Sequence, residues 1–232
     1  FECKALAEEH GVLALSSNYA LYADLSNRVM SVLSDYSPRT EVYSIDECFV
    51  DLTGTPKLRD VSYQIRERVF QWTGLPVCVG IGPTKTLAKL ANHIAKRHPR
   101  SKGVFNYNDL TDAQQTKLLS QIEVGEVWGV GRKLTQRLAA HGIATAQDLR
   151  MAHTPTLRAE FGLVMEKTQR ELQGVCCIEL DDCTPGSLYS VYTALTCKGL
   201  CVCSLYSGKW FGTVSCGSLS ECCCISIAKE HT

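Results

Sequence analysis

The spacing of apolar residues changes near residue 110, and this change constrains the fold more than any other feature of the sequence. Before it, runs of β-branched and aromatic residues that suit strands occur at 41–52 and 75–81. Helical patterns flank these runs, at 19–34, 60–73 and 84–96. Beyond residue 110 only short helical patterns remain, at 112–120, 125–140, 145–151 and 155–172. This order predicts an α+β fold, in which a sheet with packed helices precedes a small all-helical domain.

Composition narrows the class of protein without choosing a function. The 232 residues carry 24 Lys and Arg against 24 Asp and Glu, so net charge argues neither for nor against a nucleic-acid partner. No apolar run approaches the roughly 20 residues that span a bilayer, and no signal peptide opens the chain. We therefore expect a cytoplasmic protein with no membrane partner.

Two adjacent acidic residues, Asp46 and Glu47, lie near the predicted bend between the strands of 41–52. Successive strand side chains point to opposite faces, so only a turn lets both carboxylates reach one spot. Carboxylates placed in this way suit Mg²⁺, which takes one or two protein carboxylates, waters and substrate phosphate oxygens. A solvated acidic turn is the alternative, but the apolar strand sequence around the pair favours a metal site for phosphoryl transfer.

Positive charge is concentrated between Ile81 and Asn108, where six Lys and Arg residues occur without an Asp or Glu. The residue before Lys85 is Thr84 rather than Gly, so the stretch fails the pattern of a Walker phosphate-binding loop. Lys85 and Lys89 lie one turn apart on the predicted helix. Two interpretations stay open for them, a solvated basic helix face and contact with phosphate.

A helix-hairpin-helix signature lies in the predicted helical domain. An apolar residue precedes the hairpin, whose residues are Gly129, Val130, Gly131, Arg132 and Lys133. An amphipathic helix that ends at Gly142 follows. Two glycines let a tight turn present backbone N–H groups to a DNA phosphate, and Arg132, Lys133 and Arg137 add attraction that does not depend on base sequence. A helix-capping turn in any helical bundle is the alternative. Spacing, glycines and trailing apolar residues together favour DNA binding.

In this order the motifs resemble the Y-family of translesion DNA polymerases, and most closely its UmuC-like catalytic subunits. The resemblance covers about residues 1–182 and is carried by the stretches 16–30, 43–47, 82–92 and 127–132. It implies the end of the fingers at 1–17, a palm at 18–107 and a thumb with the hairpin at 108–175. Residues 176–232 are expected to form a short family-like linker and then a Cys-rich tail in place of the little finger.

The resemblance implies error-prone translesion DNA synthesis in SOS mutagenesis, by Mg²⁺-dependent nucleotidyl transfer on damaged templates. Asp46 and Glu47 resemble two of three palm carboxylates that bind magnesium, with Ser44 beside them. Lys96 resembles the lysine that contacts the incoming triphosphate, and residues 129–133 would contact the template-primer backbone. The implied partners are damaged DNA, deoxynucleoside triphosphates, a UmuD-like subunit, the recombinase and the sliding clamp.

Departures from the family keep a second interpretation open. The family opens with a strand that carries the first metal-binding Asp, followed by most of the fingers, and these do not precede Phe1. Of the 13 cysteines, ten lie at or after Cys176, without the Cys-x-x-Cys pairs of a zinc site. We expect this tail to be irregular and to come from a changed reading frame or a gene rearrangement. The alternative function is a catalytically incomplete remnant that only binds DNA through its hairpin, and a Cys-rich metal-binding regulator is a weaker third.

Overall fold

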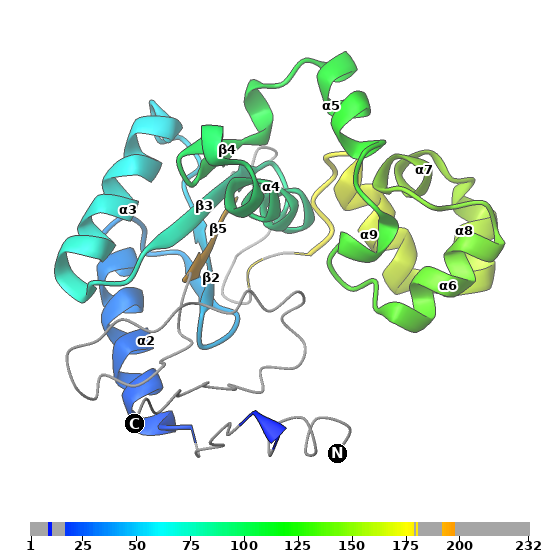
Figure 1. Cartoon of the computed structure of the whole chain (residues 1–232). Helices are drawn as coiled ribbons and strands as arrows, with labels where there is room; N and C mark the ends of the chain where they lie inside the picture. The colour runs from blue at the N-terminus through cyan, green and yellow to red at the C-terminus, as the bar shows by residue number, and fades with distance from the viewer. Residues whose placement is uncertain (1–8, 11–16, 179, 181–191, 198–232) are drawn as a thin grey trace.

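The described part of the chain forms two lobes (Figure 1). The structure is a computed structural model, and it describes residues 9–10, 17–178, 180 and 192–197. The sheet lobe comprises residues 19–106 with 192–197, and the helical lobe comprises residues 112–172. Nearly all of the predicted end of the fingers and most of the Cys-rich tail lie outside the described residues. In the described part, no helix combines the length and the apolar character needed to cross a membrane.

The sheet lobe alternates helices and strands as the periodicity predicts. In chain order its elements up to residue 106 are α2 (Tyr19–Ser34), β1 (Thr40–Val42), β2 (Glu47–Asp51), α3 (Leu58–Thr73), β3 (Val77–Gly82), α4 (Lys85–Arg97), the 3₁₀ turn η1 (Pro99–Ser101) and β4 (Val104–Asn106). Strand β4 pairs parallel with β3 and is missing from the sequence prediction, because three residues are too few to display a period.

Strand β5 (Tyr192–Cys197) completes the sheet from the far end of the chain. The strand order β1-β2-β5-β3-β4 places it between β2 and β3, antiparallel to both. Glu47 lies opposite Thr196, and Gly82 lies opposite Tyr192. The expectation of an irregular tail is therefore wrong for residues 192–197. The backbone groups of two central strands find their hydrogen-bond partners on β5.

Helix α4 takes part in the packing of both lobes. On one face of the sheet, α2 and α3 supply Val29 and Val69, which pack with Val79 of β3. Helix α4 packs along β3, and Figure 1 shows it between the sheet and the helical lobe. Its Leu90 belongs to the same hydrophobic cluster as Leu149 of the helical lobe. A displacement of α4 would therefore disturb both lobes.

The helical lobe contains shorter helices than the sequence predicts. After the 3₁₀ turn η2 (Tyr107–Asp109) come α5 (Asp112–Leu119), η3 (Val124–Glu126), α6 (Arg132–Ala140), α7 (Ala146–Met151), α8 (Thr154–Phe161) and α9 (Leu163–Leu172). The predicted helix 155–172 is two helices, because Gly162 adopts a φ of 85° that ends α8. Of the predicted helix 125–140, only the part that forms α6 is an α-helix. The residues before α6 form the end of the 3₁₀ turn η3 and the hairpin.

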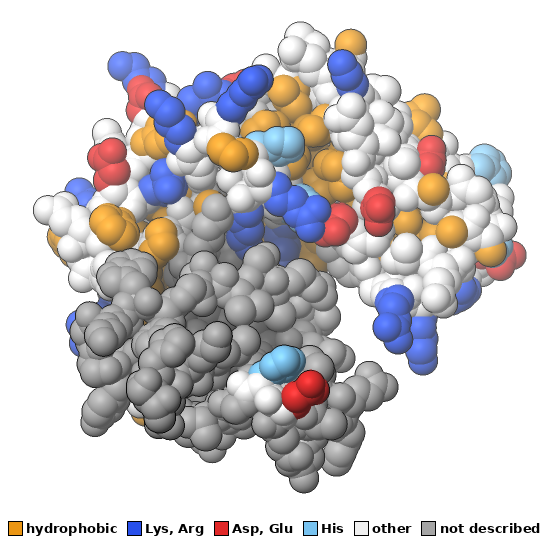
Figure 2. All heavy atoms as spheres, in the orientation of Figure 1, with side chains coloured by type: hydrophobic (Ala, Val, Ile, Leu, Met, Phe, Trp, Pro, Cys, Tyr) orange, Lys and Arg blue, Asp and Glu red, His pale blue; other side chains and the backbone are white. Residues whose placement is uncertain are grey.

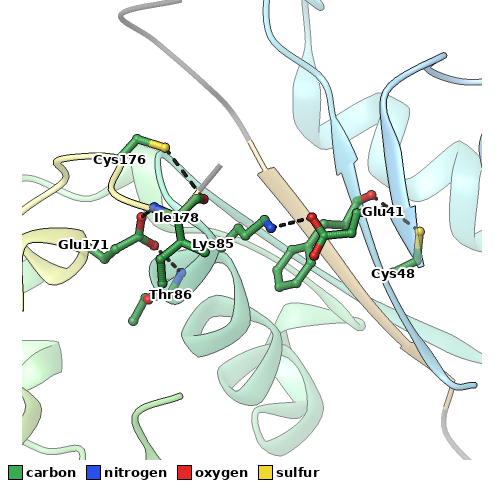
Figure 3. A network of polar contacts seen from close by, with 8 residues as sticks. Glu41, Cys48, Lys85, Thr86, Glu171, Cys176 and Ile178 are labelled. Carbon is green, nitrogen blue, oxygen red and sulfur yellow. Dashed lines mark hydrogen bonds and ion pairs between the residues drawn. The ribbon is translucent and has the colours of Figure 1, made fainter. Parts of the chain in front are cut away.

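A buried glutamate, Glu171, fastens the helical lobe to the sheet lobe (Figure 3). Its carboxylate accepts hydrogen bonds from the backbone N–H of Thr86 at 3.0 Å, Cys177 at 2.8 Å and Ile178 at 3.0 Å. The hydroxyl of Thr84, the N-cap of α4, donates to the carbonyl of Glu171 at 2.9 Å. The negative charge also lies at the positive end of the α4 dipole. The end of α9 is thus held against the start of α4.

Candidate functional site

The acidic pair lies where β1 turns into β2. The backbone N–H groups of Tyr43 and Ser44 both donate to the carbonyl of Glu47, at 3.0 and 3.1 Å, and close the turn. Ser44 Oγ donates to Asp46 Oδ1 at 2.7 Å, which orients that carboxylate. The predicted strand, turn and strand is confirmed. Both carboxylates are half-buried, so each is partly held by the protein and partly open to solvent.

Lys89 approaches the acidic pair from α4. Its Nζ lies 3.0 Å from Glu47 Oε2, and the two side chains are 20% and 23% exposed. A pair that is shielded to this degree is screened less by salt than a fully exposed one. The interpretation of Lys89 as part of a solvated basic face is therefore wrong, because the ammonium pairs with the carboxylate predicted to bind metal.

Lys96 lies on the same helix, and its charge interacts with both members of the acidic pair. Burial lowers the pKa of Lys96 below its ordinary value, and the negative charges of Glu47 and Asp46 oppose that shift. Lys96 is half-buried. The structure thus brings together four predicted site residues, namely Ser44, Asp46, Glu47 and Lys96.

Lys85 takes a different role from both interpretations left open for it. Its side chain is 2% exposed and forms an ion pair with Glu41 of β1 (Figure 3). Because this cation is buried and neutralised inside the protein, it is neither a solvated charge nor a phosphate contact.

Burial raises the pKa of the neighbouring Cys48 thiol to about 12, and the charge of Glu41 acts in the same direction. Cys48 therefore stays protonated and is a poor metal ligand.

The predicted hairpin forms the turn that leads into α6. Gly129 adopts a φ of 85°, a left-handed conformation that favours glycine, and Val130 is buried as the apolar anchor of the turn. Gly131 is the N-cap of α6, so the amides that follow it belong to a helix start, whose first N–H groups have no partner within the helix. Arg132 and Lys133 are exposed. Figure 2 shows Lys and Arg side chains at the end of the helical lobe where α6 lies.

The hairpin also leaves room for a ligand to approach its backbone. A Cβ placed on Gly129 or Gly131 would meet no atom of the described structure within 4 Å. Bare backbone, a helix N-terminus and two exposed cations are the features that bind phosphate groups. The predicted hairpin residues are therefore together in space, in a lobe different from that of the acidic pair.

Within the described residues, no group of three or more His, Cys, Asp and Glu side chains is placed to hold a metal ion. The fit to Mg²⁺ depends on the oxygen donors of Asp46 and Glu47. This hard cation is commonly bound by one or two carboxylates, with waters and substrate phosphates completing its coordination. Because both carboxylates are accessible at a turn, the residues present fit a magnesium site of this kind.

The sequence prediction missed three residues beside the acidic pair. Glu41 neutralises Lys85, and Tyr43 contacts Trp128 of the helical lobe through a hydrogen bond and ring packing. The signal for Glu41 was its position in an otherwise apolar strand pattern, where a charge requires a partner. Trp128 carried a weaker signal, a large aromatic residue directly before the Gly-x-Gly hairpin.

Comparison with protein families matches two separate regions of the chain. The model of the impB/mucB/samB family matches residues 1–93, and the model of the IMS family HHH motif matches residues 112–143. The second match contains the hairpin and confirms the predicted helix-hairpin-helix motif.

Individual relatives and a solved structure agree with these matches. The chain is 48% identical over 189 residues to Protein UmuC of Salmonella typhimurium and 43% identical over 188 residues to Protein MucB of Escherichia coli. Each match covers 80% of this chain and 44% of the relative, so the chain spans less than half the length of these relatives. The solved insertion ternary complex of Dbh DNA polymerase is 25% identical, with a TM-score of 0.54, over 67% of this chain and 44% of that one. The predicted α+β class is confirmed.

Proposed function

The chain belongs to the impB/mucB/samB family, within the Y-family polymerases, and we propose that it serves error-prone translesion DNA synthesis in SOS mutagenesis. In this proposal residues 18–107 are the palm, residues 108–175 are the thumb, and damaged DNA and deoxynucleoside triphosphates are the substrates. A UmuD-like subunit, the recombinase and the sliding clamp are proposed partners. Because the substrate is DNA, the proposed site of action is the bacterial cytoplasm.

The observation that supports the proposal best is the acidic turn with Lys96 beside it. We infer that Asp46 and Glu47 bind Mg²⁺ and that Lys96 contacts the triphosphate of the incoming nucleotide. When bound there, Mg²⁺ would neutralise the part of the triphosphate's negative charge that Lys96 alone does not balance. The chain's own contribution is to orient Asp46 through Ser44 and to supply the positive charge of Lys96.

The alternative is a remnant that binds DNA without synthesis, and the observation that favours it is the hairpin, which starts α6 in the helical lobe and matches a family model of its own. Primer extension by this chain on a template with an abasic site, with Mg²⁺ and with chelator, separates the two functions. Extension that the chelator abolishes supports the polymerase. DNA affinity that falls steeply with salt, without extension, supports the remnant.

The hairpin proposal predicts that Gly131→Ala weakens DNA binding while the chain stays folded. The φ of Gly131 is −82° and its surroundings are open, so alanine fits and costs at most about 1 kcal/mol as a poorer N-cap. The new methyl group would keep a phosphate from the hairpin amides, for a loss of roughly 1–2 kcal/mol, or about 5- to 30-fold in affinity. Fluorescence anisotropy with labelled primer-template measures the affinity.

A charge variant provides the matched comparison for this hairpin test. Gly131→Ala removes no charge, so the slope of log affinity against log salt stays as in the unaltered chain, whereas Lys133→Gln lowers the slope by about 0.9. Unchanged affinity in Gly131→Ala would show that DNA phosphate does not approach the hairpin backbone.

The role proposed for Lys96 predicts a pH dependence of nucleotide binding. Burial lowers the pKa of Lys96, so the folded chain releases this proton at a lower pH than the unfolded chain, whose lysine has a pKa of about 10.4. The buried, protonated lysine therefore lowers the free energy of unfolding at pH values below the lowered pKa. This destabilisation fades as the pH rises toward 10.4. Nucleotide affinity should fall as the pH rises through the lowered pKa of the folded chain, because Lys96 then loses the charge that attracts the triphosphate. Lys96→Arg, which keeps its charge, should retain affinity to higher pH in calorimetric titrations. Loss of affinity at the same pH in both proteins would contradict the contact.

A further inference from the structure

Two aromatic rings and a carboxylate form a cage around the ammonium group of Lys89. Its Nζ lies 4.4 Å from the ring centroid of Tyr43 and 5.2 Å from that of Trp128. Phe49 packs against both rings, with its ring centroid 5.9 Å from that of Tyr43 and 5.7 Å from that of Trp128, while its own cation contact is with Lys85. On its remaining side the ammonium is bonded to Glu47. Lys89 is thus held between a carboxylate and two rings.

The cage draws its rings from both lobes. Tyr43 belongs to the β1–β2 region, whereas Trp128 directly precedes the hairpin of the helical lobe. Trp128 Nε1 donates to the Tyr43 hydroxyl at 3.1 Å, and the two rings meet edge to face at 5.4 Å. Val127, its chain neighbour, is buried in the cluster that includes α4 residues. The position of the ring is therefore fixed by a directional bond as well as by packing.

We propose that Trp128 and Tyr43 are positioning residues that hold Lys89 on Glu47 and so link the hairpin to the acidic pair. This inference rests on the proposed function, because it assigns Glu47 to a cation and the hairpin to DNA. A divalent cation at Glu47 competes with the Lys89 ammonium for the same carboxylate. The rings keep the released ammonium in place, since a cation over an aromatic face is attracted even without its carboxylate.

The link makes Trp128 a reporter of cation binding at Glu47. The experiment uses the 232-residue chain with Trp72→Phe and Trp210→Phe, which leaves Trp128 as the one tryptophan. Mg²⁺ is titrated while the emission of Trp128 and, in parallel, the heat of binding are followed. The expected result is an emission change with the same midpoint as the heat, because the ammonium beside the indole loses the compensating charge of Glu47 when that carboxylate turns to the cation.

Lys89→Met in the same background is the deciding variant. It should bind Mg²⁺ by calorimetry and show no emission change at Trp128. An emission change that persists in Lys89→Met, or Mg²⁺ binding by the parent without an emission change, overturns the link and leaves the proposed metal site standing. Absence of Mg²⁺ binding in the parent overturns the proposed metal site, and the link with it.

Kinetics separate a positioning role from a purely structural one. Where the chain extends primers, Trp128→Ala should lower kcat by roughly 10- to 100-fold, the effect of a small misplacement of reacting groups, with DNA affinity close to that of the parent. Trp128→Phe keeps the ring and should restore most of the rate. Tyr43→Phe and Trp128→Phe remove the two ends of one hydrogen bond, so their effects should not add. A lower Tm in Trp128→Ala with unchanged kcat would reject the positioning role.

Discussion

Replacing Asp46 with asparagine is expected to slow metal-dependent nucleotide incorporation by roughly 10³-fold and to leave DNA affinity unchanged. Asparagine matches aspartate in size, and its amide oxygen can still accept the hydrogen bond from Ser44. The substitution removes one negative charge from the proposed magnesium site. A bound metal contributes several kcal/mol of transition-state stabilisation, so the rate should fall by roughly 10³-fold at 1.36 kcal/mol per factor of ten. Single-turnover primer extension measures the rate.

Asp24→Asn is the matched control for this substitution. Asp24 lies on α2, half of its side chain surface is exposed, and its partner is Arg28 one turn away at 2.8 Å. Surface pairs of this kind contribute about 0.3–0.5 kcal/mol, so the control should behave as the unaltered chain. DNA affinity serves as the internal check, because the hairpin lies in the other lobe. Wild-type extension by Asp46→Asn would remove Asp46 from the catalytic site.

The elements with a strong period could be predicted closely from the sequence. Helix α2 was predicted at 19–34, and its observed bounds are the same. Its apolar stripe at every fourth residue is a signal that a sheet or loop does not produce. The acidic pair was also placed correctly at a turn, because strand-like residues on both sides leave only the bend for two adjacent carboxylates.

What the sequence could not reveal depends on contacts between distant segments. The burial of Lys85 requires Glu41, 44 positions away along the chain, and the helical spacing of Lys85 and Lys89 gives no sign that one is buried and the other caged. Strand β5 finds its partners on β2 and β3, so its place in the sheet is a tertiary property. The sequence prediction placed Gly162 inside one helix, 155–172, and the break at this residue is visible only in its backbone φ of 85°.

Gly80→Ala is expected to unfold the sheet lobe or to leave it barely stable. Gly80 lies on the fully buried strand β3, against α4. A Cβ there would lie 2.0 Å from the backbone nitrogen of Asn92 and 2.4 Å from the carbonyl oxygen of Ala88. These are backbone atoms of a helix, so they cannot turn aside as a side chain would. Overpacking of a core typically costs 1–3 kcal/mol, and we expect at least about 3 kcal/mol here.

The loss should spread beyond the strand because α4 carries residues of both lobes. Asn92, which donates to the carbonyl of Cys78 at 2.7 Å, would be pushed from β3, and Lys89 and Lys96 would move with the helix. Urea unfolding followed by circular dichroism measures the free energy of unfolding. Gly131→Ala is the matched control, since the same change there meets open space and should cost at most about 1 kcal/mol. Equal free energies of unfolding in the two variants would mean that β3 and α4 are not as close as the structure places them, and the positions of Lys89 and Lys96 beside the acidic pair would then fail with them.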